Sequence, residues 1–82
     1  MNFQVYVIYS EDFDKIYIGM TSSLEKRIYA HNNLPKGWTK SFRPWRLVYT
    51  EEFEEKTQAL SREKELKSHQ GRDFIRTQIV GR

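Results

Sequence analysis

The chain has 82 residues, no cysteine and a net charge of +3. This length excludes a second domain, because a chain of this size buries only about 60% of its unfolded surface, and it predicts a single domain over residues 1–82. The absence of cysteine excludes a disulfide framework. The sequence has no apolar run of roughly 20 residues, and its N-terminus lacks the order of a signal peptide. Both features predict a cytoplasmic protein without a membrane partner.

The first half of the chain predicts a β-hairpin followed by a helix. Residues 3–10 and 15–21 are rich in β-branched and aromatic side chains, and the acidic segment between them is typical of a short hairpin loop. The pattern then becomes helical, since Ser22 and Glu25 match a capping box. This helix is expected to run to about Asn33.

The second half of the chain predicts one more strand and two more helices. Residues 34–44 are expected to form a loop in which one helical turn fits, and residues 45–53 a third strand. A longer helix follows over residues 54–70, with Gly71 placed to end it, and residues 72–80 form a last short helix. The order β-β-α-β-α-α predicts an α+β fold with a three-stranded antiparallel sheet flanked by helices.

The hairpin register brings two tyrosines together. A four-residue loop pairs Tyr6 with Gly19 and Ile8 with Tyr17, so both phenol rings lie on one face of the sheet. Glycine inside a strand often marks close approach by a ligand or by backbone, so a cleft is expected over Gly19. The alternative is a bulged hairpin with both tyrosines packed against helices, and a register slip would separate them.

The first helix places two polar side chains beside its apolar face. Leu24 and Ile28 define the inward stripe, and Arg27 and His31 lie along one edge of it. Either residue has an ordinary structural explanation, because arginine can extend along apolar surface and histidine can be hydrogen-bonded packing. Their proximity to the two tyrosines favours a functional site.

A carboxylate falls on the inward side of the second helix. Glu63 lies between Ala59, Leu60 and Leu66, all three expected on the buried side. A buried carboxylate needs a cation or strong hydrogen bonds, and Lys67, one turn later, is the structural partner. The alternative is a divalent cation, because Mg²⁺ and Mn²⁺ prefer oxygen ligands and retain several waters.

A basic segment rich in aromatic residues lies between the first helix and the third strand. Six bases and no acid fall between residues 26 and 46, together with Trp38, Phe42 and Trp45. Such a mixture suits phosphates and unstacked bases. The alternative is a solvated basic loop with its aromatic rings turned inward. The bases are Lys26, Arg27, Lys36, Lys40, Arg43 and Arg46.

Three stretches together carry a resemblance to a known family. "VYVIYS", then "YIGMTSSLEKRIYAH", and later "LSREKELK" resemble the GIY-YIG nuclease superfamily over about residues 3–79. Within it, the chain is most similar to small stand-alone bacterial proteins that consist of the GIY-YIG domain. The resemblance implies metal-assisted hydrolysis of a phosphodiester, with Mg²⁺ or Mn²⁺ on Glu63. The catalytic residues that it implies are Tyr6, Tyr17, Arg27, His31 and Glu63.

The expected substrate is DNA that is branched, damaged or single-stranded, cut in a structure-selective or weakly sequence-specific way, and a protein partner is compatible with this role. The alternative is a non-catalytic or partner-dependent nucleic-acid-binding module, because no asparagine follows Asn33, whereas many relatives carry one beyond the glutamate. A purely structural role for Glu63 and Lys67 is the third interpretation. The residues expected to contact nucleic acid are Gly19, Lys36, Trp38, Lys40, Arg43, Arg46 and Lys67.

Overall fold

The computed structural model describes residues 2–35 and 37–81. Its elements follow the predicted order, with a short 3₁₀-helix added before the third strand and a π-helix at the C-terminal end. Within these residues, no helix is both long and apolar enough to span a bilayer. The elements are β1 Phe3–Ser10, β2 Lys15–Thr21, α1 Leu24–Asn33, η1 Trp38–Phe42, β3 Arg46–Phe53, α2 Lys56–Lys67, α3 His69–Phe74 and η2 Ile75–Val80.

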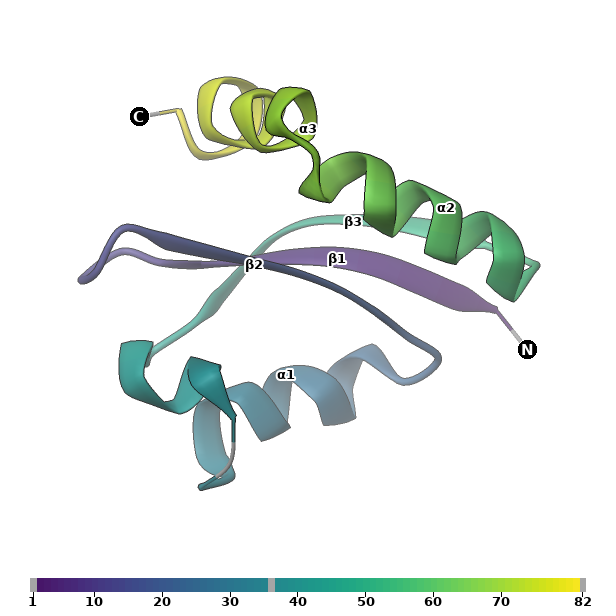
Figure 1. The fold of residues 1–82 in the computed structure, drawn as a ribbon. Coiled ribbons are helices and arrows are strands. Elements are labelled where there is room, and N and C mark those ends of the chain that lie inside the picture. Colours follow the sequence, from purple (N-terminus) through teal and green to yellow (C-terminus); the bar gives the residue numbers. More distant parts are fainter. Residues whose placement is uncertain (1, 36, 82) are drawn as a thin grey trace.

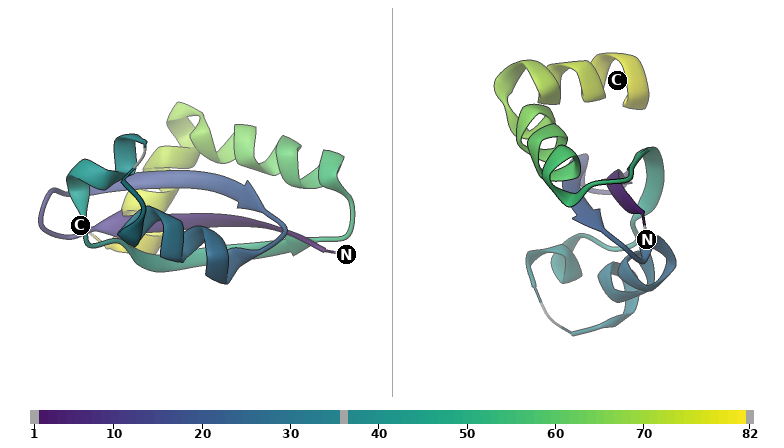
Figure 2. Two further views of the ribbon diagram at one scale, coloured as in Figure 1. Left: turned by 90° about the horizontal axis from the view of Figure 1, so that it is seen from below. Right: turned by 90° about the vertical axis from the view of Figure 1, so that its right-hand side faces the viewer.

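The sheet lies between two helical layers. Figure 1 shows α1 and the 3₁₀-helix η1 below the sheet, and α2 with α3 above it. The end-on view in Figure 2 shows the same separation, with α2 beside β2 and α1 on the opposite face. The α+β fold with a three-stranded antiparallel sheet is therefore confirmed.

The strand register is the predicted one. The sheet order is β2-β1-β3, and Tyr6 pairs with Gly19 while Ile8 pairs with Tyr17. The hairpin between β1 and β2 runs without a register shift, and the one irregularity lies between β1 and β3, at Val7 and Ile8. Because successive strand residues point to opposite faces, this register puts both tyrosines on the α1 side.

The central strand β1 is buried on both faces. The larger core cluster lies between the sheet and the helices α2 and η2. It contains Val5, Val7 and Tyr9 of β1 and Ile75 of η2. Tyr6 and Ile8 belong to a smaller cluster on the other face. Burial on both faces explains why β1 carries no charged side chain.

Three local predictions are wrong. Gly71 does not end the long helix, which stops at Lys67. A Cβ on Gly71 would lie 2.4 Å from the carbonyl oxygen of Glu65, so glycine is needed where the backbone of α3 approaches α2. Leu60 is 43% exposed, not buried. The side of α2 that faces the core is formed by Ala59 and Leu66, the two buried residues of this helix.

The third wrong prediction concerns the start of α1. Its N-cap is Ser23, which makes no side-chain capping bond, so the expected capping box of Ser22 and Glu25 does not form. The hydroxyl of Thr21 instead accepts a hydrogen bond from the backbone N–H of Ser23. The entry to α1 is thus held from the last residue of β2.

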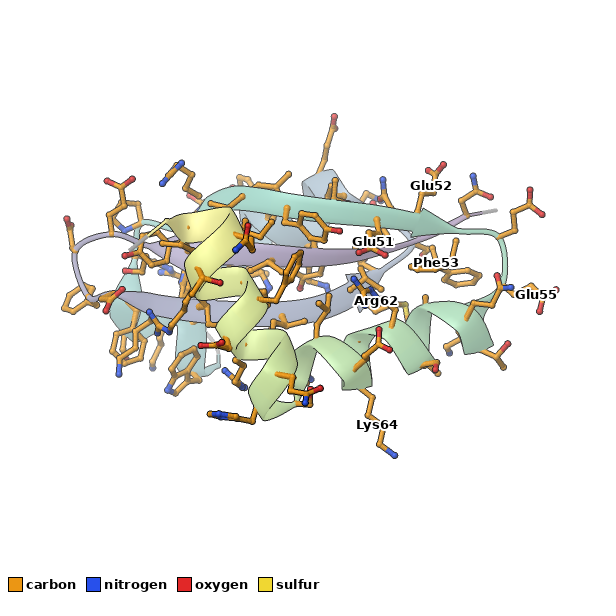
Figure 3. All side chains as sticks on the ribbon, turned by 90° about the horizontal axis from the view of Figure 1, so that it is seen from above. Glu51, Glu52, Phe53, Glu55, Arg62 and Lys64 are labelled. Atoms are coloured by element: carbon orange, nitrogen blue, oxygen red, sulfur yellow. The ribbon has the colours of Figure 1, made fainter. Side chains whose placement is uncertain are left out.

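Helix α2 is tied to the sheet on the side away from the two tyrosines. Arg62 of α2 donates hydrogen bonds to Glu51 of β3 and to Glu65, and Tyr49 donates to Glu51. Figure 3 shows Arg62 turned toward Glu51, whereas Lys64 extends away from the sheet. This ion-pair network fixes the rotation of α2 and therefore the direction in which Glu63 points.

Candidate active site

The phenol of Tyr6 lies flat across Gly19. A Cβ built on Gly19 would lie 2.5 Å from Tyr6 Oη and 2.7 Å from Cζ, distances that real atoms do not adopt. Tyr6 is 1% exposed and Gly19 is buried as well. The cleft predicted over Gly19 is therefore filled by the phenol ring, and glycine is required there so that Tyr6 can lie across β2.

A chain of hydrogen bonds runs from Tyr6 through His31 to Thr39. Tyr6 Oη lies 2.8 Å from His31 Nε2, and His31 Nδ1 lies 3.0 Å from Thr39 Oγ1. All three residues are buried. With a protonated phenol and a neutral imidazole, Tyr6 donates to Nε2 and Nδ1–H donates to Thr39.

The second tyrosine packs against this chain. The ring centroid of Tyr17 lies 4.7 Å from that of His31 and 6.2 Å from that of Tyr6. The three rings come from β1, β2 and α1, so the hairpin register and the docking of α1 together place them.

Burial sets the protonation states of the chain. Burial is the main cause that raises the pKa of Tyr6 well above its ordinary value of 10.0, and the neighbouring Tyr17 is the second. Arg27 lowers the pKa of Tyr6, and Glu63 raises it further. Burial, followed by Arg27 and then Arg43, lowers the pKa of His31 below 6.5. Tyr6 therefore stays protonated and His31 is a neutral acceptor.

A pocket of about 250 Å³ opens beside His31. Arg27, an exposed residue of α1, borders this pocket, and Tyr17, Trp38 and Thr39 form other parts of its wall. Arg27 also borders a smaller pocket near Lys56. Positive charge at the opening and neutral hydrogen-bonding groups behind it are suited to a phosphate group.

Glu63 comes from α2, on the other face of the sheet. Its side chain is 19% exposed, and Lys67 Nζ lies 3.0 Å from its Oε2, so the ion pair predicted as the structural alternative is present. Glu63 is still close enough to Tyr6 to raise the pKa of the phenol. Helix α2 packs against β1 and the edge strand β2, which brings the charge of Glu63 close enough to act on Tyr6.

The donor set around Glu63 fits a hydrated hard cation and no other metal class. Within the described part of the chain, no group of three or more histidine or carboxylate side chains gathers that could enclose a metal. A single partly buried carboxylate matches Mg²⁺ or Mn²⁺, which are often bound through one carboxylate, several waters and substrate phosphate. A tetrahedral zinc site, which needs three or four protein ligands, does not fit.

The remaining candidate contacts differ in exposure and in their partners. Trp38 is 52% exposed beside the pocket, and Lys40 is exposed on η1. Arg43 donates to the backbone carbonyls of His31 and Leu34, where it closes the C-terminal end of α1. Arg46 pairs with Glu11 of the hairpin loop at 2.6 Å. Lys67 is paired with Glu63, and Lys36 lies outside the described residues.

Thr39 is the residue of this site that the sequence pattern did not indicate. The indole of Trp45 donates to the carbonyl of Thr39 at 2.7 Å. Asn32 of α1 accepts from the backbone N–H of Trp45 at 2.7 Å and donates to its carbonyl at 3.1 Å. These bonds hold η1 against α1 and point the Thr39 hydroxyl at His31. The only sequence signal was the position of Thr39 between Trp38 and Lys40.

Comparison with known proteins places the chain in a family. The model of the GIY-YIG catalytic domain matches residues 2–76. A UPF0213 protein of Clostridium perfringens is 47% identical over 64 residues, covering 77% of this chain and 67% of that protein. A UPF0213 protein of Staphylococcus saprophyticus is 42% identical over 65 residues and 78% of each chain.

A solved relative supports the same assignment. The solution NMR structure of a UPF0213 protein from Bacillus halodurans is 28% identical and has a TM-score of 0.57, covering 94% of this chain and 84% of that chain. The resemblance noted in the sequence is thus confirmed. The chain belongs to the GIY-YIG catalytic-domain family, among the small UPF0213 proteins of bacteria and archaea.

Proposed function

We propose that this protein is a metal-dependent endonuclease that hydrolyses DNA phosphodiester bonds. The observation that carries the proposal is the buried chain Tyr6–His31–Thr39, whose central imidazole is neutral and lies beside a pocket bordered by Arg27. A neutral histidine held by hydrogen bonds on both nitrogens is a competent proton acceptor near neutral pH.

The proton path follows from the hydrogen bonds. As the water oxygen attacks phosphorus, its proton passes to Tyr6 Oη while the Tyr6 proton passes to His31 Nε2. The phosphorus–oxygen bond to the leaving nucleotide breaks, the leaving oxygen takes up a proton from solvent water, and His31 returns the proton it accepted to solvent. No free phenolate accumulates, which is consistent with the raised pKa of Tyr6. Tyr6 is 1% exposed, so the transfer requires the phosphate to enter past the side chains that cover the phenol.

Arg27 and Glu63 have separate roles in this scheme. Arg27, at the border of the pocket, stabilises the negative charge that develops on the non-bridging phosphate oxygens. Glu63 is the residue that would hold Mg²⁺ or Mn²⁺, and the bound cation supplies charge stabilisation at the phosphate and leaving oxygens. Lys67, now paired with Glu63, would be released toward the substrate.

Cleavage of a DNA panel tests the proposal. The panel contains branched, flapped, damaged and single-stranded DNA, each incubated with Mn²⁺, with Mg²⁺ and with EDTA. We expect nicking that requires the cation and is lost in Glu63→Ala and in Tyr6→Phe, both of which fold normally by circular dichroism. Lys64→Ala is the matched control, because Lys64 extends from the same helix away from the sheet. Wild-type activity in Glu63→Ala would remove the metal role.

A nucleic-acid-binding module without its own turnover is the second candidate. The Glu63–Lys67 ion pair favours it, because Lys67 occupies the carboxylate that a cation would need. This candidate predicts salt-sensitive DNA binding, with a slope set by the phosphates neutralised, and no product at any Mn²⁺ concentration unless a partner protein is added. Metal-dependent nicking by the purified chain would exclude it.

A further inference from the structure

A second hollow lies on the other side of Tyr17 from the catalytic pocket. Its volume is about 370 Å³, within the range of about 300–1,000 Å³ that is usual for ligand pockets. Tyr17 and Trp38 line both this hollow and the pocket beside His31, so the two are neighbours separated by these rings. We call it the outer hollow. Its lining residues are Ile16, Tyr17, Ile18, Trp38, Lys67 and Arg72.

The aromatic rings at the outer hollow begin a track of contacting rings, in which Tyr17 and Phe42 are partly buried against the core and Trp38 and Phe13 are exposed. The rings of Tyr17 and Trp38 are close to parallel, at 27° with centroids 6.5 Å apart. Trp38 lies 4.7 Å from Phe42, and Phe42 lies 5.5 Å from Phe13 at the hairpin loop. Trp38 and Phe13 are about half exposed, at 52% and 49%. Large aromatic rings joined into one exposed surface mark an interaction site more often than isolated ones do.

Positive charge accompanies the track. Lys67 and Arg72 line the outer hollow, and Arg72 Nε donates to the backbone carbonyl of Lys67 at 3.2 Å, which holds the Arg72 side chain against the C-terminal end of α2. Further along, Lys15 Nζ lies over the ring of Phe42 at 5.6 Å. None of the six residues lining the hollow is acidic, but Lys67 is also paired with Glu63 of α2, so without a metal Arg72 supplies the larger part of the positive charge. Aromatic faces next to cations are complementary to bases and phosphates of a single strand.

We propose that the outer hollow binds an unpaired nucleotide next to the scissile phosphate. Its base lies against Trp38 and Tyr17, its phosphate is held by Lys67 and Arg72, and the strand continues over Phe42 toward Phe13. A base inside a duplex has its faces covered by stacked neighbours, so only an unpaired base can lie on these rings. The inference rests on the proposed nuclease function, and it specifies DNA with a single-stranded segment at the cleavage site.

Binding without turnover tests the inference. Three fluorescein-labelled probes of equal length, a short oligothymidylate, its abasic counterpart and a blunt duplex, are titrated in EDTA and followed by anisotropy. We expect the oligothymidylate to bind more tightly than the abasic strand. Trp38→Ala should weaken oligothymidylate binding by about 5- to 150-fold, the effect of losing one base–aromatic stack. It should leave binding of the abasic strand nearly unchanged.

Matched variants separate stacking from loss of structure. Trp38→Phe keeps an aromatic face and should restore most of the oligothymidylate affinity. Tyr29→Ala removes a ring that is 62% exposed on α1 and lines neither pocket, so it should have no effect. The double variant Lys67→Ala/Arg72→Ala should weaken both single strands and reduce the salt slope by about 0.7, the value for one phosphate that is no longer neutralised.

Two results would overturn the inference: equal affinity of the wild type for the oligothymidylate and the abasic strand, or unchanged oligothymidylate binding in Trp38→Ala. The same preparations are assayed for Mn²⁺-dependent nicking. If base-dependent binding is absent while Glu63-dependent nicking is present, the outer hollow fails and the proposed function stands. If base-dependent binding is present but nicking is absent, the nuclease proposal fails and the nucleotide site remains.

Discussion

Replacing Thr39 by valine isolates the hydrogen bond behind His31. Thr39 Oγ1 is 3.0 Å from His31 Nδ1, and the residue is 5% exposed. Valine puts a methyl group where threonine has its hydroxyl, and the bond from the Trp45 indole reaches the Thr39 backbone, which does not change. The substitution therefore removes the acceptor for Nδ1–H and keeps the backbone of η1 in place.

The size of the effect follows from the burial of the imidazole. His31 is 8% exposed, so its Nδ1–H would lose its partner without gaining solvent. A buried donor left unsatisfied costs about 1–3 kcal/mol. The cost destabilises the tautomer with a proton on Nδ1, which is the one whose Nε2 can accept the Tyr6 proton. Because about 1.36 kcal/mol is a factor of ten in rate, kcat should fall about 5- to 150-fold.

Single-turnover nicking of the best DNA substrate in Mn²⁺ measures this loss, and urea unfolding of the same protein measures its stability. Thr39→Ser is the control, because serine retains the hydroxyl and should keep kcat within about threefold of wild type. A Thr39→Val protein that is folded and cleaves at the wild-type rate would refute the role of Thr39 in positioning His31.

Three further predictions concern the same group of residues. Gly19→Ala places a Cβ 2.5 Å from Tyr6 Oη, so the phenol must move away from His31; we expect loss of cleavage and a decrease of about 1–3 kcal/mol in the free energy of unfolding, measured in urea. Burial lowers the pKa of His31 below 6.5, so on acidification the unfolded chain binds this proton before the folded chain does. The contribution of neutral His31 to stability is therefore complete above about pH 6.5 and is lost as pH falls through the lower pKa of the folded protein. The melting temperature should therefore decrease on acidification, and less so in His31→Gln; an equal decrease in both proteins would contradict this. Mn²⁺ should raise the melting temperature of the wild type but not of Glu63→Gln, by the linkage between binding and folding, and an equal rise in both would place the cation elsewhere.

The hairpin could be predicted in detail because its register depends on local information. A four-residue loop and alternating side chains leave one register that buries the apolar positions, and Tyr6 does pair with Gly19. The reason for Gly19 could not be predicted, since a glycine in a strand is equally compatible with a cleft and with a ring lying across it. The structure shows the ring.

The helices show where periodicity stops being informative. A helical wheel placed Glu63 near the buried side and also indicated Lys67 as its partner, and both features are present. It placed Leu60 inside as well, but the Arg62–Glu51 ion pair fixes a rotation that leaves Leu60 exposed. Gly71 ended no helix, because its role is set by the close approach of two helices, which one helix's pattern does not contain.

The sequence by itself determined the order of the elements, the pairing of the hairpin and the residue types that carry the chemistry, because these depend on alternation, helical spacing and short loops. Tertiary structure alone decided the partners of three polar side chains that lie far from them in the chain: Thr39 for His31, backbone carbonyls for Arg43, and Glu11 for Arg46. Partner choice depends on how α1, η1 and the sheet dock, and docking joins residues far apart in the chain. The protonation states follow from the same docking, since burial of Tyr6 and His31 is what moves both pKa values.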